Sequence, residues 1–235
     1  MIHITGDIHG AIFERFTMEA MPGEDNWGVD DKLIVLGDFG LIFYPKIERF
    51  LFERQLEKKN LEYLESKPYE ILFIDGNHEN FDRLFAESEE KERYGGTVRR
   101  IGRNIYWLQR GQIYTIEDKT FFCMGGAYSI DKAWRQEGIS WWQQESPSGK
   151  EYKLATDNLI SAGRKVDYIL THTCPQVFIP IMGHAADPHD FELTSFLNWI
   201  WYEIEFKHWY FGHWHIDKEL HSKVTAMFED VISIE

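Results

Sequence analysis

The sequence predicts an α/β protein, and two observations carry this prediction. Short apolar runs of β type alternate along the chain with longer helical ones, and the first long helical segment lies between two strand-like runs. Strand–helix–strand order is typical of sheets whose faces are covered by helices. The 235 residues contain no internal repeat and no Gly/Ser-rich or Pro-rich linker. We therefore expect a single domain over residues 1–235.

The first half of the chain supplies the first predicted elements. Residues 2–5, 33–36 and 70–74 are apolar runs that predict buried strands. Between the second and third strands, residues 45–66 predict a helix with Pro45 near its first turn and an end before Pro68. The charged run at residues 87–93 predicts a solvated helix face.

The second half begins with signals of antiparallel strands. Residues 104–108, 112–116 and 120–124 are strand-like and are joined by short polar turns, which predicts hairpins. A further strand at residues 167–171 precedes a helix that starts near Asp190, its predicted N-cap. Residues 208–211 and 224–228 predict the closing strands.

Composition excludes several classes of protein. The net charge of −14 argues against nucleic acid as a general partner, because an acidic surface repels phosphate backbones. No apolar run approaches the length of a membrane span, and the N-terminus does not resemble a signal peptide. The two cysteines cannot supply a disulfide framework. We therefore expect a cytoplasmic protein, and the sequence leaves its oligomeric state open.

Polar residues follow five of the predicted strands, and their positions are the most informative feature. The carboxyl ends of strands in an open α/β sheet form the crevice where ligands bind, so these segments are expected to converge. The segments are Gly6-Asp7-Ile8-His9-Gly10, Gly37-Asp38-Phe39-Gly40, Gly76-Asn77-His78-Glu79, the single His172, and Gly212-His213-Trp214-His215.

The residue types in these segments indicate a metal site. Asp, Asn and His offer oxygen and nitrogen ligands without a thiolate, which suits Mn, Fe or Zn in a mixed site. In Asp-x-His and His-x-His on an extended chain, the two side chains point the same way and can reach one ion. The number of candidate ligands exceeds what one tetrahedral ion needs, so two divalent ions are predicted.

In this order, the five segments resemble the motifs of the calcineurin-like metallophosphoesterase superfamily. The resemblance implies an α/β fold built as a β-sandwich of mixed sheets flanked by helices. It also implies that Asp38 bridges two metal ions, of which manganese is favoured. The implied ligands of the first ion are Asp7, His9 and His215, and those of the second are Asn77, His172 and His213.

The resemblance further implies the reaction: hydrolysis of a phosphate ester by a metal-activated water. His78 matches the residue that contacts the phosphate and protonates the leaving oxygen, and Glu79 matches the acidic residue that orients this histidine. Two ions suit this chemistry because they clamp the phosphoryl group and lower the pKa of a water. A histidine near its ordinary pKa suits proton donation.

Alternative functions remain open at this stage. The second motif lacks the second Asp of the Gly-Asp-x-x-Asp pattern, and no Asp-Arg-Gly of the protein Ser/Thr phosphatases follows Asp38. A Ser/Thr protein phosphatase is disfavoured for this reason, and a phosphodiesterase or nuclease is disfavoured by the acidic surface. A non-catalytic metal-binding scaffold is the alternative from another class, although His78 and every implied ligand are present.

Residues 125–150 are a candidate substrate lid, because paired glycines introduce a segment rich in tryptophan. We expect Arg135 to contact phosphate, and Tyr128 and Trp142 to contact the organic part of a phosphorylated small molecule or peptide. The alternative for Trp141 and Trp142 is a place in the hydrophobic core.

Overall fold

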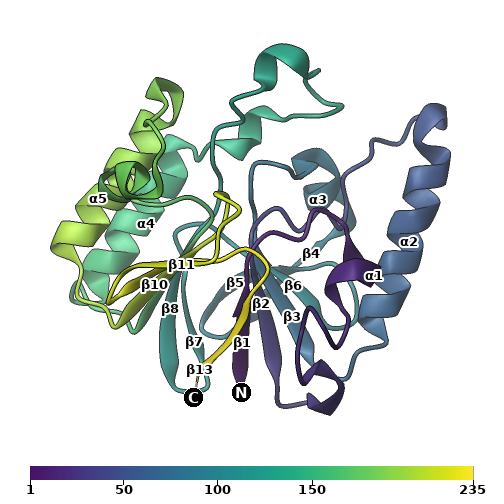
Figure 1. The fold of residues 1–235 in the computed structure, drawn as a ribbon, viewed down its shortest axis with the longest axis horizontal. Helices are drawn as coiled ribbons and strands as arrows, with labels where there is room; N and C mark the ends of the chain where they lie inside the picture. The colour runs from purple at the N-terminus through teal and green to yellow at the C-terminus, as the bar shows by residue number, and fades with distance from the viewer. Residues whose placement is uncertain (235) are drawn as a thin grey trace.

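Two β-sheets pack face to face between two layers of helices in the computed structural model, which describes residues 1–234 (Figure 1). The first sheet contains, in spatial order, β13 (Val231–Ile234), β1 (Ile2–Thr5), β2 (Lys32–Leu36), β3 (Glu70–Ile74), β6 (Ile105–Leu108), β5 (Gly96–Arg100) and β4 (Glu89–Arg93). Its four central strands are parallel, and the outer ones are antiparallel to their neighbours.

The second sheet contains, in spatial order, β11 (Lys218–His221), β12 (Val224–Ala226), β10 (His208–Phe211), β9 (Tyr168–Thr171), β8 (Lys119–Met124) and β7 (Ile113–Ile116). Its inner strands are parallel, and β11 and β7 pair antiparallel at its two edges. Both sheets are therefore mixed. The predicted α/β fold, a sandwich of mixed sheets flanked by helices, is confirmed.

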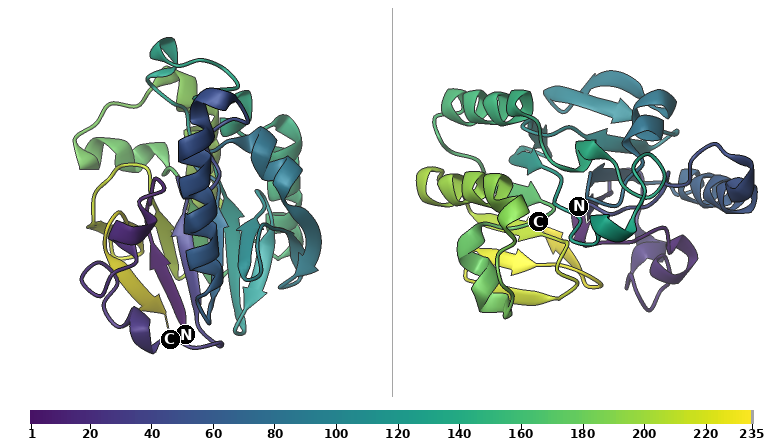
Figure 2. Two further views of the ribbon diagram at one scale, coloured as in Figure 1. Left: turned by 90° about the vertical axis from the view of Figure 1, so that its right-hand side faces the viewer. Right: turned by 90° about the horizontal axis from the view of Figure 1, so that it is seen from above.

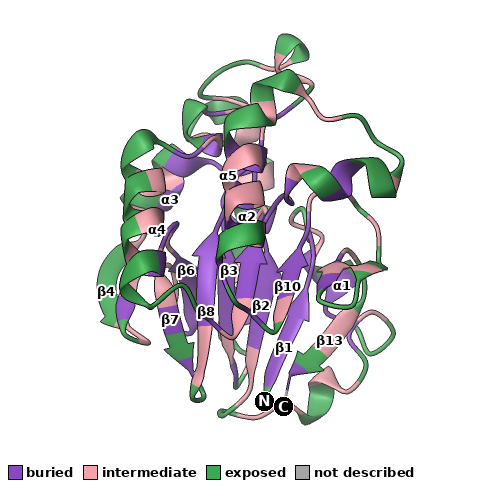
Figure 3. Ribbon diagram, turned by 90° about the vertical axis from the view of Figure 1, so that its left-hand side faces the viewer, coloured by how far each residue is buried: buried purple, intermediate pink, exposed green. Residues whose placement is uncertain are grey.

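Alternation along the strands explains the layers, because successive side chains of a strand face opposite sides of the sheet. Ile34 and Leu36 face the second sheet and meet Phe121 and Leu170 in the central core. Their neighbour Val35 points outward and packs in the helix-covered core of the first sheet. The central strands are consequently buried on both faces, whereas the edge strand β4 and the outer sides of the helices are exposed (Figure 3).

Helices cover the outer face of each sheet. The first sheet carries α1 (Ile12–Arg15), α2 (Leu51–Glu65) and α3 (Phe81–Glu87), and the second carries α4 (Gly149–Ser161) and α5 (Phe191–Glu203). The α2 helix starts later than the predicted 45–66, because Pro45 lies in an irregular segment followed by a short 3₁₀ turn over Glu48–Phe50. The α5 helix follows Asp190 as predicted, but the Asp190 side chain makes no capping hydrogen bond.

The prediction of a helix at residues 87–93 is wrong. Residues Glu89–Arg93 form the edge strand β4, which pairs with β5 through a tight turn at Tyr94 and Gly95, both with positive φ. Acidic residues of β4 face basic ones of β5, as in the ion pair of Glu89 with Arg100. Cross-strand charge pairing and the turn explain why a charged segment is a strand.

The predicted hairpins are confirmed only in part. Strands β7 and β8 form one, but β6 pairs parallel with β3 and antiparallel with β5 in the other sheet. The turn at Arg110 and Gly111 therefore carries the chain from one sheet to the other. Within residues 1–234, no helix is long and apolar enough to cross a membrane.

The segment between β8 and α4, which contains most of the candidate lid, rises beyond the carboxyl ends of the strands (Figures 1 and 2). It contains two short 3₁₀ turns, Lys132–Trp134 and Gln143–Glu145. Seen from above, it lies over the line where the two sheets meet (Figure 2).

Candidate metal centre

The loops that carry the predicted ligands meet at one edge of the sandwich. Strands β1, β2 and β3 of the first sheet and β9 and β10 of the second end there. The first two loops are joined by their backbones, since the N–H groups of Ile8 and His9 donate to the Asp38 carbonyl at 3.1 and 2.7 Å. The seven ligands implied by the sequence are thereby brought to one place.

The backbone of these loops is strained. Eight non-glycine residues of the described chain have positive φ, and four of them are implied ligands: His9, Asp38, His213 and His215. A side chain in the left-handed region costs about 1–2 kcal/mol per residue, and such costs concentrate at functional sites. The surrounding packing therefore holds these side chains in conformations that an isolated loop would avoid.

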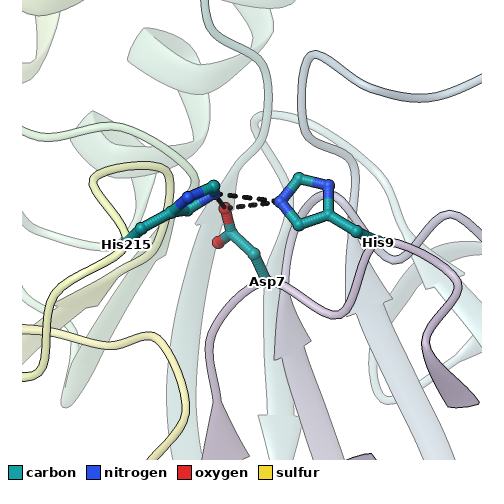
Figure 4. Close-up of side chains that lie close together, drawn as sticks. All are labelled: Asp7, His9 and His215. Carbon is teal, nitrogen blue, oxygen red and sulfur yellow. Dashed lines mark hydrogen bonds and ion pairs between the residues drawn. The ribbon is translucent and has the colours of Figure 1, made fainter. Parts of the chain in front are cut away.

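The first group contains Asp7, His9 and His215, whose potential ligand atoms lie within 4.8 Å of one another (Figure 4). The Nε2 atoms of the two histidines are 2.9 Å apart, and they lie 3.6 Å (His9) and 3.0 Å (His215) from Asp7 Oδ2. The other oxygen, Oδ1, accepts a hydrogen bond of 2.9 Å from the backbone of His213. Three side chains from two distant parts of the sequence thus converge on one point.

The second group is centred on His172, which is completely buried. Its Nδ1 atom lies 2.7 Å from the Leu36 carbonyl, so this nitrogen carries the proton and donates it. Its Nε2 atom lies 3.0 Å from Asn77 Oδ1 and 3.4 Å from Asp38 Oδ1. The His213 ring stands edge-on to the His172 ring, with centroids 5.0 Å apart.

Asp38 lies between the two groups. Its Oδ1 faces His172, and its Oδ2 lies 3.9 Å from His9 Nδ1. The backbone N–H of His78 donates to Oδ1 at 2.7 Å and fixes the carboxylate.

Two glycines make this crowding possible. A Cβ atom on Gly76 would lie 2.0 Å from Asp38 Oδ1, and one on Gly37 would lie 2.2 Å from His172 Nδ1. Gly37 also has a φ of +93°, which few residues other than glycine adopt. The glycines of the second and third motifs therefore let the backbone pass directly against the ligand side chains.

The electrostatics of the centre favour ionised carboxylates. Burial opposes ionisation of Asp7, but the neighbouring imidazoles of His215 and His9 lower the pKa of Asp7 to about 2. Burial likewise opposes ionisation of Asp38, but the charge and hydrogen bond of His172 hold its pKa well below the usual range. Burial alone would lower the pKa of His172, yet Asp38 raises it to about 10.

His213 behaves in the opposite way. Burial, followed by repulsion from His172, lowers the pKa of His213 to about 3. The imidazole is therefore neutral at pH 7, which is the form that ligates a metal ion.

The donors of the centre fit divalent metal ions. Asp7 Oδ2 is buried and has no hydrogen-bond partner among residues 1–234, although two imidazole nitrogens approach it. His172 Nε2 faces two oxygen atoms while its other nitrogen is committed to Leu36. A cation at either point would satisfy electron-pair donors that otherwise face one another.

His78 stands at the rim of the centre and is partly exposed, with Nε2 4.0 Å from Asp38 Oδ2. Burial is the main factor that lowers its pKa, and the charge of Arg135 acts in the same direction. Glu79 is buried, and its Oε1 accepts a hydrogen bond from the Phe39 backbone at 2.9 Å. No hydrogen bond joins Glu79 to His78 within the described residues. The structure therefore places Glu79 as a support for the Asp38 loop rather than beside the imidazole.

The candidate lid reaches the centre through Arg135. Its Nη1 and Nη2 atoms lie 2.7 and 3.2 Å from the two ring nitrogens of His78, and its Nε pairs with Asp131 at 2.7 Å. Trp142 does not face the centre: it is 2% exposed, packs in the core of the first sheet, and donates to Asp82. The core alternative therefore describes Trp142.

Tyr128 lines a cleft of about 660 Å³ that opens onto the centre. Its ring stacks on that of His189 at 4.8 Å. Ile130, Ile179 and Trp214 add apolar surface to the same cleft. A larger hollow of about 880 Å³ adjoins the lid elsewhere and contains none of the implied ligands.

Two buried residues of the lid, Ser129 and Glu145, were not predicted from the sequence as site residues. They are hydrogen-bonded to the centre through Asn77. Single Ser and Glu residues in a loop carry no local signal.

The site thus combines Asp, Asn and His side chains at the strand ends of a mixed two-sheet sandwich, a donor set that suits a divalent metal ion. The family model described as calcineurin-like phosphoesterase matches residues 1–217. The chain therefore belongs to this family. The family binds divalent metal ions, and the chain contains candidate ligand groups for them.

The fold also resembles a solved structure. A Staphylococcus aureus protein assigned as a 5'-nucleotidase, crystallised with α-ketoglutarate, aligns with 100% of this chain and 51% of its own, at 14% identity and a TM-score of 0.52. This chain thus spans about half the length of that protein, and the similarity at this identity shows the fold alone. A comparison with curated proteins gives no match.

Proposed function

We propose that the chain hydrolyses phosphate esters of small molecules with two divalent metal ions, manganese being favoured. Asp7, His9 and His215 would hold the first ion, and Asn77, His172 and His213 the second. The observation that carries the proposal is the position of Asp38 between the two groups, with one carboxylate oxygen toward each. When bound, the ions would neutralise the phosphoryl oxygens and activate a water.

The chain's own residues support the remaining steps. His78 stands beside the centre, partly exposed, where its imidazole can give a proton to the leaving oxygen of the ester. Arg135 adds a fixed positive charge next to His78, which suits a phosphate oxygen. Glu79 contributes by holding the Asp38 loop.

The cleft beside Tyr128 supports a small organic leaving group. Its walls combine Tyr128, Ile130, Ile179 and Trp214 with polar groups, and its volume of about 660 Å³ suits a molecule of nucleotide size. A nucleoside monophosphate therefore belongs in a substrate panel, together with simpler monoesters and a diester.

We further infer that residues 1–235 act as one domain in the cytoplasm, since Cys123 and Cys174 are buried and free.

The first test is turnover of p-nitrophenyl phosphate and bis(p-nitrophenyl) phosphate by the manganese-loaded protein. His78→Ala is expected to lower kcat about 10²- to 10⁴-fold, the usual contribution of a general acid. His221→Ala is the matched control, because His221 is exposed and lies away from the centre. Absence of turnover with two ions bound would reject the proposed hydrolysis of simple esters.

A second comparison tests the role of His78 itself. A p-nitrophenolate leaves readily without a proton, whereas an alkoxide does not, so His78→Ala should reduce turnover of an alkyl phosphate more than that of p-nitrophenyl phosphate. Equal losses with both esters would show that His78 does not act as the general acid.

A further inference from the structure

Asn77 is connected to the lid by a chain of buried hydrogen bonds. Its Nδ2 donates to Ser129 Oγ at 3.0 Å, and Ser129 Oγ donates to Glu145 Oε2 at 2.8 Å. The second oxygen, Oε1, accepts from the Ser129 backbone at 3.0 Å and pairs with Lys132 Nζ at 2.5 Å. Asn77, Ser129 and Glu145 are 3%, 2% and 0% exposed, so water does not compete for these bonds.

The chemistry of the chain gives every bond a direction. A carboxylate only accepts hydrogen bonds, so Ser129 must donate its single hydroxyl proton to Glu145. The Ser129 oxygen can then only accept, and the group of Asn77 that faces it must be the NH₂. The opposite end of the amide, Oδ1, is thereby turned toward His172 Nε2.

The position of Glu145 is itself held by a second buried ion pair. Arg110 pairs with Asp75 at 2.5 Å, and its Nη2 donates to the carbonyls of Gln144 and Glu145 at 2.9 and 3.1 Å. Asp75 directly follows the last residue of β3 and lies two residues before Asn77. The end of the lid and the strand that carries Asn77 are therefore attached to the same guanidinium.

We propose that Ser129 and Glu145 are positioning residues for the second metal ion, since they hold the Asn77 amide with its oxygen toward the centre. The inference rests on the proposed function, in which Asn77 is a ligand of that ion. Because both residues belong to the lid, the conformation of the lid determines whether Asn77 can bind the ion. A lid segment that moved away would free the amide to rotate.

Glu145→Gln tests this proposal without changing side-chain volume. The glutamine oxygen would stay on the side of Lys132 and the Ser129 N–H, which are both donors, so its NH₂ would face Ser129 Oγ. The Ser129 hydroxyl would then donate to Asn77 and favour the flipped amide, with nitrogen toward the centre. Ser129→Ala removes the constraint but does not reverse it.

Binding of Mn²⁺ to the metal-free protein, followed by calorimetry and by electron paramagnetic resonance, gives a readout independent of turnover. In both variants, Ser129→Ala and Glu145→Gln, the first Mn²⁺ ion should bind with the affinity of the wild type. The second should bind about 10- to 100-fold more weakly in Ser129→Ala, the usual effect of removing an outer partner of a ligand, and more weakly still in Glu145→Gln. The control is Glu57→Gln, because Glu57 is a buried carboxylate that accepts from the backbones of Phe43 and Tyr44 and from Arg83, and no hydrogen bond or ion pair among residues 1–234 joins it to Asn77.

A double substitution separates positioning from a purely structural role. In Asn77→Asp both ends of the side chain are oxygens, so its orientation no longer matters. Glu145→Gln should then leave the affinity for the second ion unchanged or raise it, whereas it lowers this affinity when Asn77 is present.

Each outcome bears on a different statement. If the wild type binds two ions and Glu145→Gln binds both with the same affinity, the positioning role is rejected while the proposed function stands. Equal weakening of the second ion by Glu145→Gln and Glu57→Gln would reject it too. A wild type that binds a single ion would overturn the two-ion proposal and this inference with it.

Discussion

Replacement of Gly37 by alanine tests whether close packing of the backbone against His172 builds the centre. The added Cβ would lie 2.2 Å from His172 Nδ1 and 2.7 Å from its Cγ, both well inside van der Waals contact. The His172 ring cannot simply turn away, because it is completely buried and its Nδ1 donates to the Leu36 carbonyl at 2.7 Å.

Two costs add up at this position. The φ of +93° costs an alanine about 1–2 kcal/mol, and forcing a methyl group into a packed site costs about 1–3 kcal/mol. The free energy of unfolding should therefore fall by about 2–5 kcal/mol, which lowers Tm by about 4–20 °C for a domain of this size. Displacement of His172 should also weaken binding of the second metal ion.

Thermal unfolding of the metal-free and manganese-loaded proteins measures both effects. Gly23→Ala is the matched control, because Gly23 has a similar φ of +83° but a Cβ there would meet nothing within 4 Å. Gly23→Ala should lose only the backbone cost of about 1–2 kcal/mol and keep its metal affinity. If the two variants lose the same stability and both bind manganese normally, contact with His172 does not constrain the centre.

Three further predictions follow from the structure. Asp167 pairs with Lys207, and this pair together with the Thr120 backbone lowers the pKa of Asp167 in the folded state. The ionised Asp167 therefore stabilises the fold at pH values above its usual pKa of 3.8. This stabilisation is lost as the pH falls through the lower pKa of the folded state. Asp167→Asn should accordingly lower the free energy of unfolding by about 1 kcal/mol at pH 7, and urea titrations should show this difference disappear in acid; a difference that persists at pH 2 would contradict the assignment. Arg135→Ala should lower kcat/KM for a phosphate monoester about 10- to 100-fold, with Arg135→Lys intermediate because a lysine keeps the charge but not the fork; unchanged kinetics would remove Arg135 from the substrate site. Removal of metal with EDTA should lower Tm by about 5–10 °C, since an ion present at about 100 times its Kd adds about 2.7 kcal/mol, and an identical Tm with and without EDTA would argue against a metal held by the folded centre.

Much of the fold could be predicted from local patterns. The strands at residues 2–5, 33–36 and 70–74 were recognisable because they are short apolar runs bounded by glycine and polar residues, and the structure has β1, β2 and β3 there. The charged strand β4 was not recognisable. Its conformation depends on partners in β5 and on the turn at Tyr94 and Gly95, and composition favours a helix for a run of Glu, Lys and Arg.

For the candidate centre, too, one part could be predicted from the sequence and another part could not. The identity of its side chains was predictable because each follows a strand directly, and the ends of parallel strands share one edge of a sheet. The motif predicts that Glu79 orients His78, but in the structure Glu79 accepts a hydrogen bond from the Phe39 backbone instead. The orientation of a buried carboxylate depends on which N–H group packing brings to it, and a motif does not contain that information.

The sequence by itself determined the class of fold, the order of the central strands along the chain and the kind of donor at each loop, because these depend on residue type and on neighbours a few positions away. Tertiary structure decided which donors share a point in space. Asp7 meets His215 and His172 meets Asn77 only because two sheets pack face to face and close the loops over one edge. The same packing buries Ser129 and Glu145 behind Asn77, where water does not compete for their hydrogen bonds and the acceptor-only carboxylate of Glu145 sets the direction of each bond.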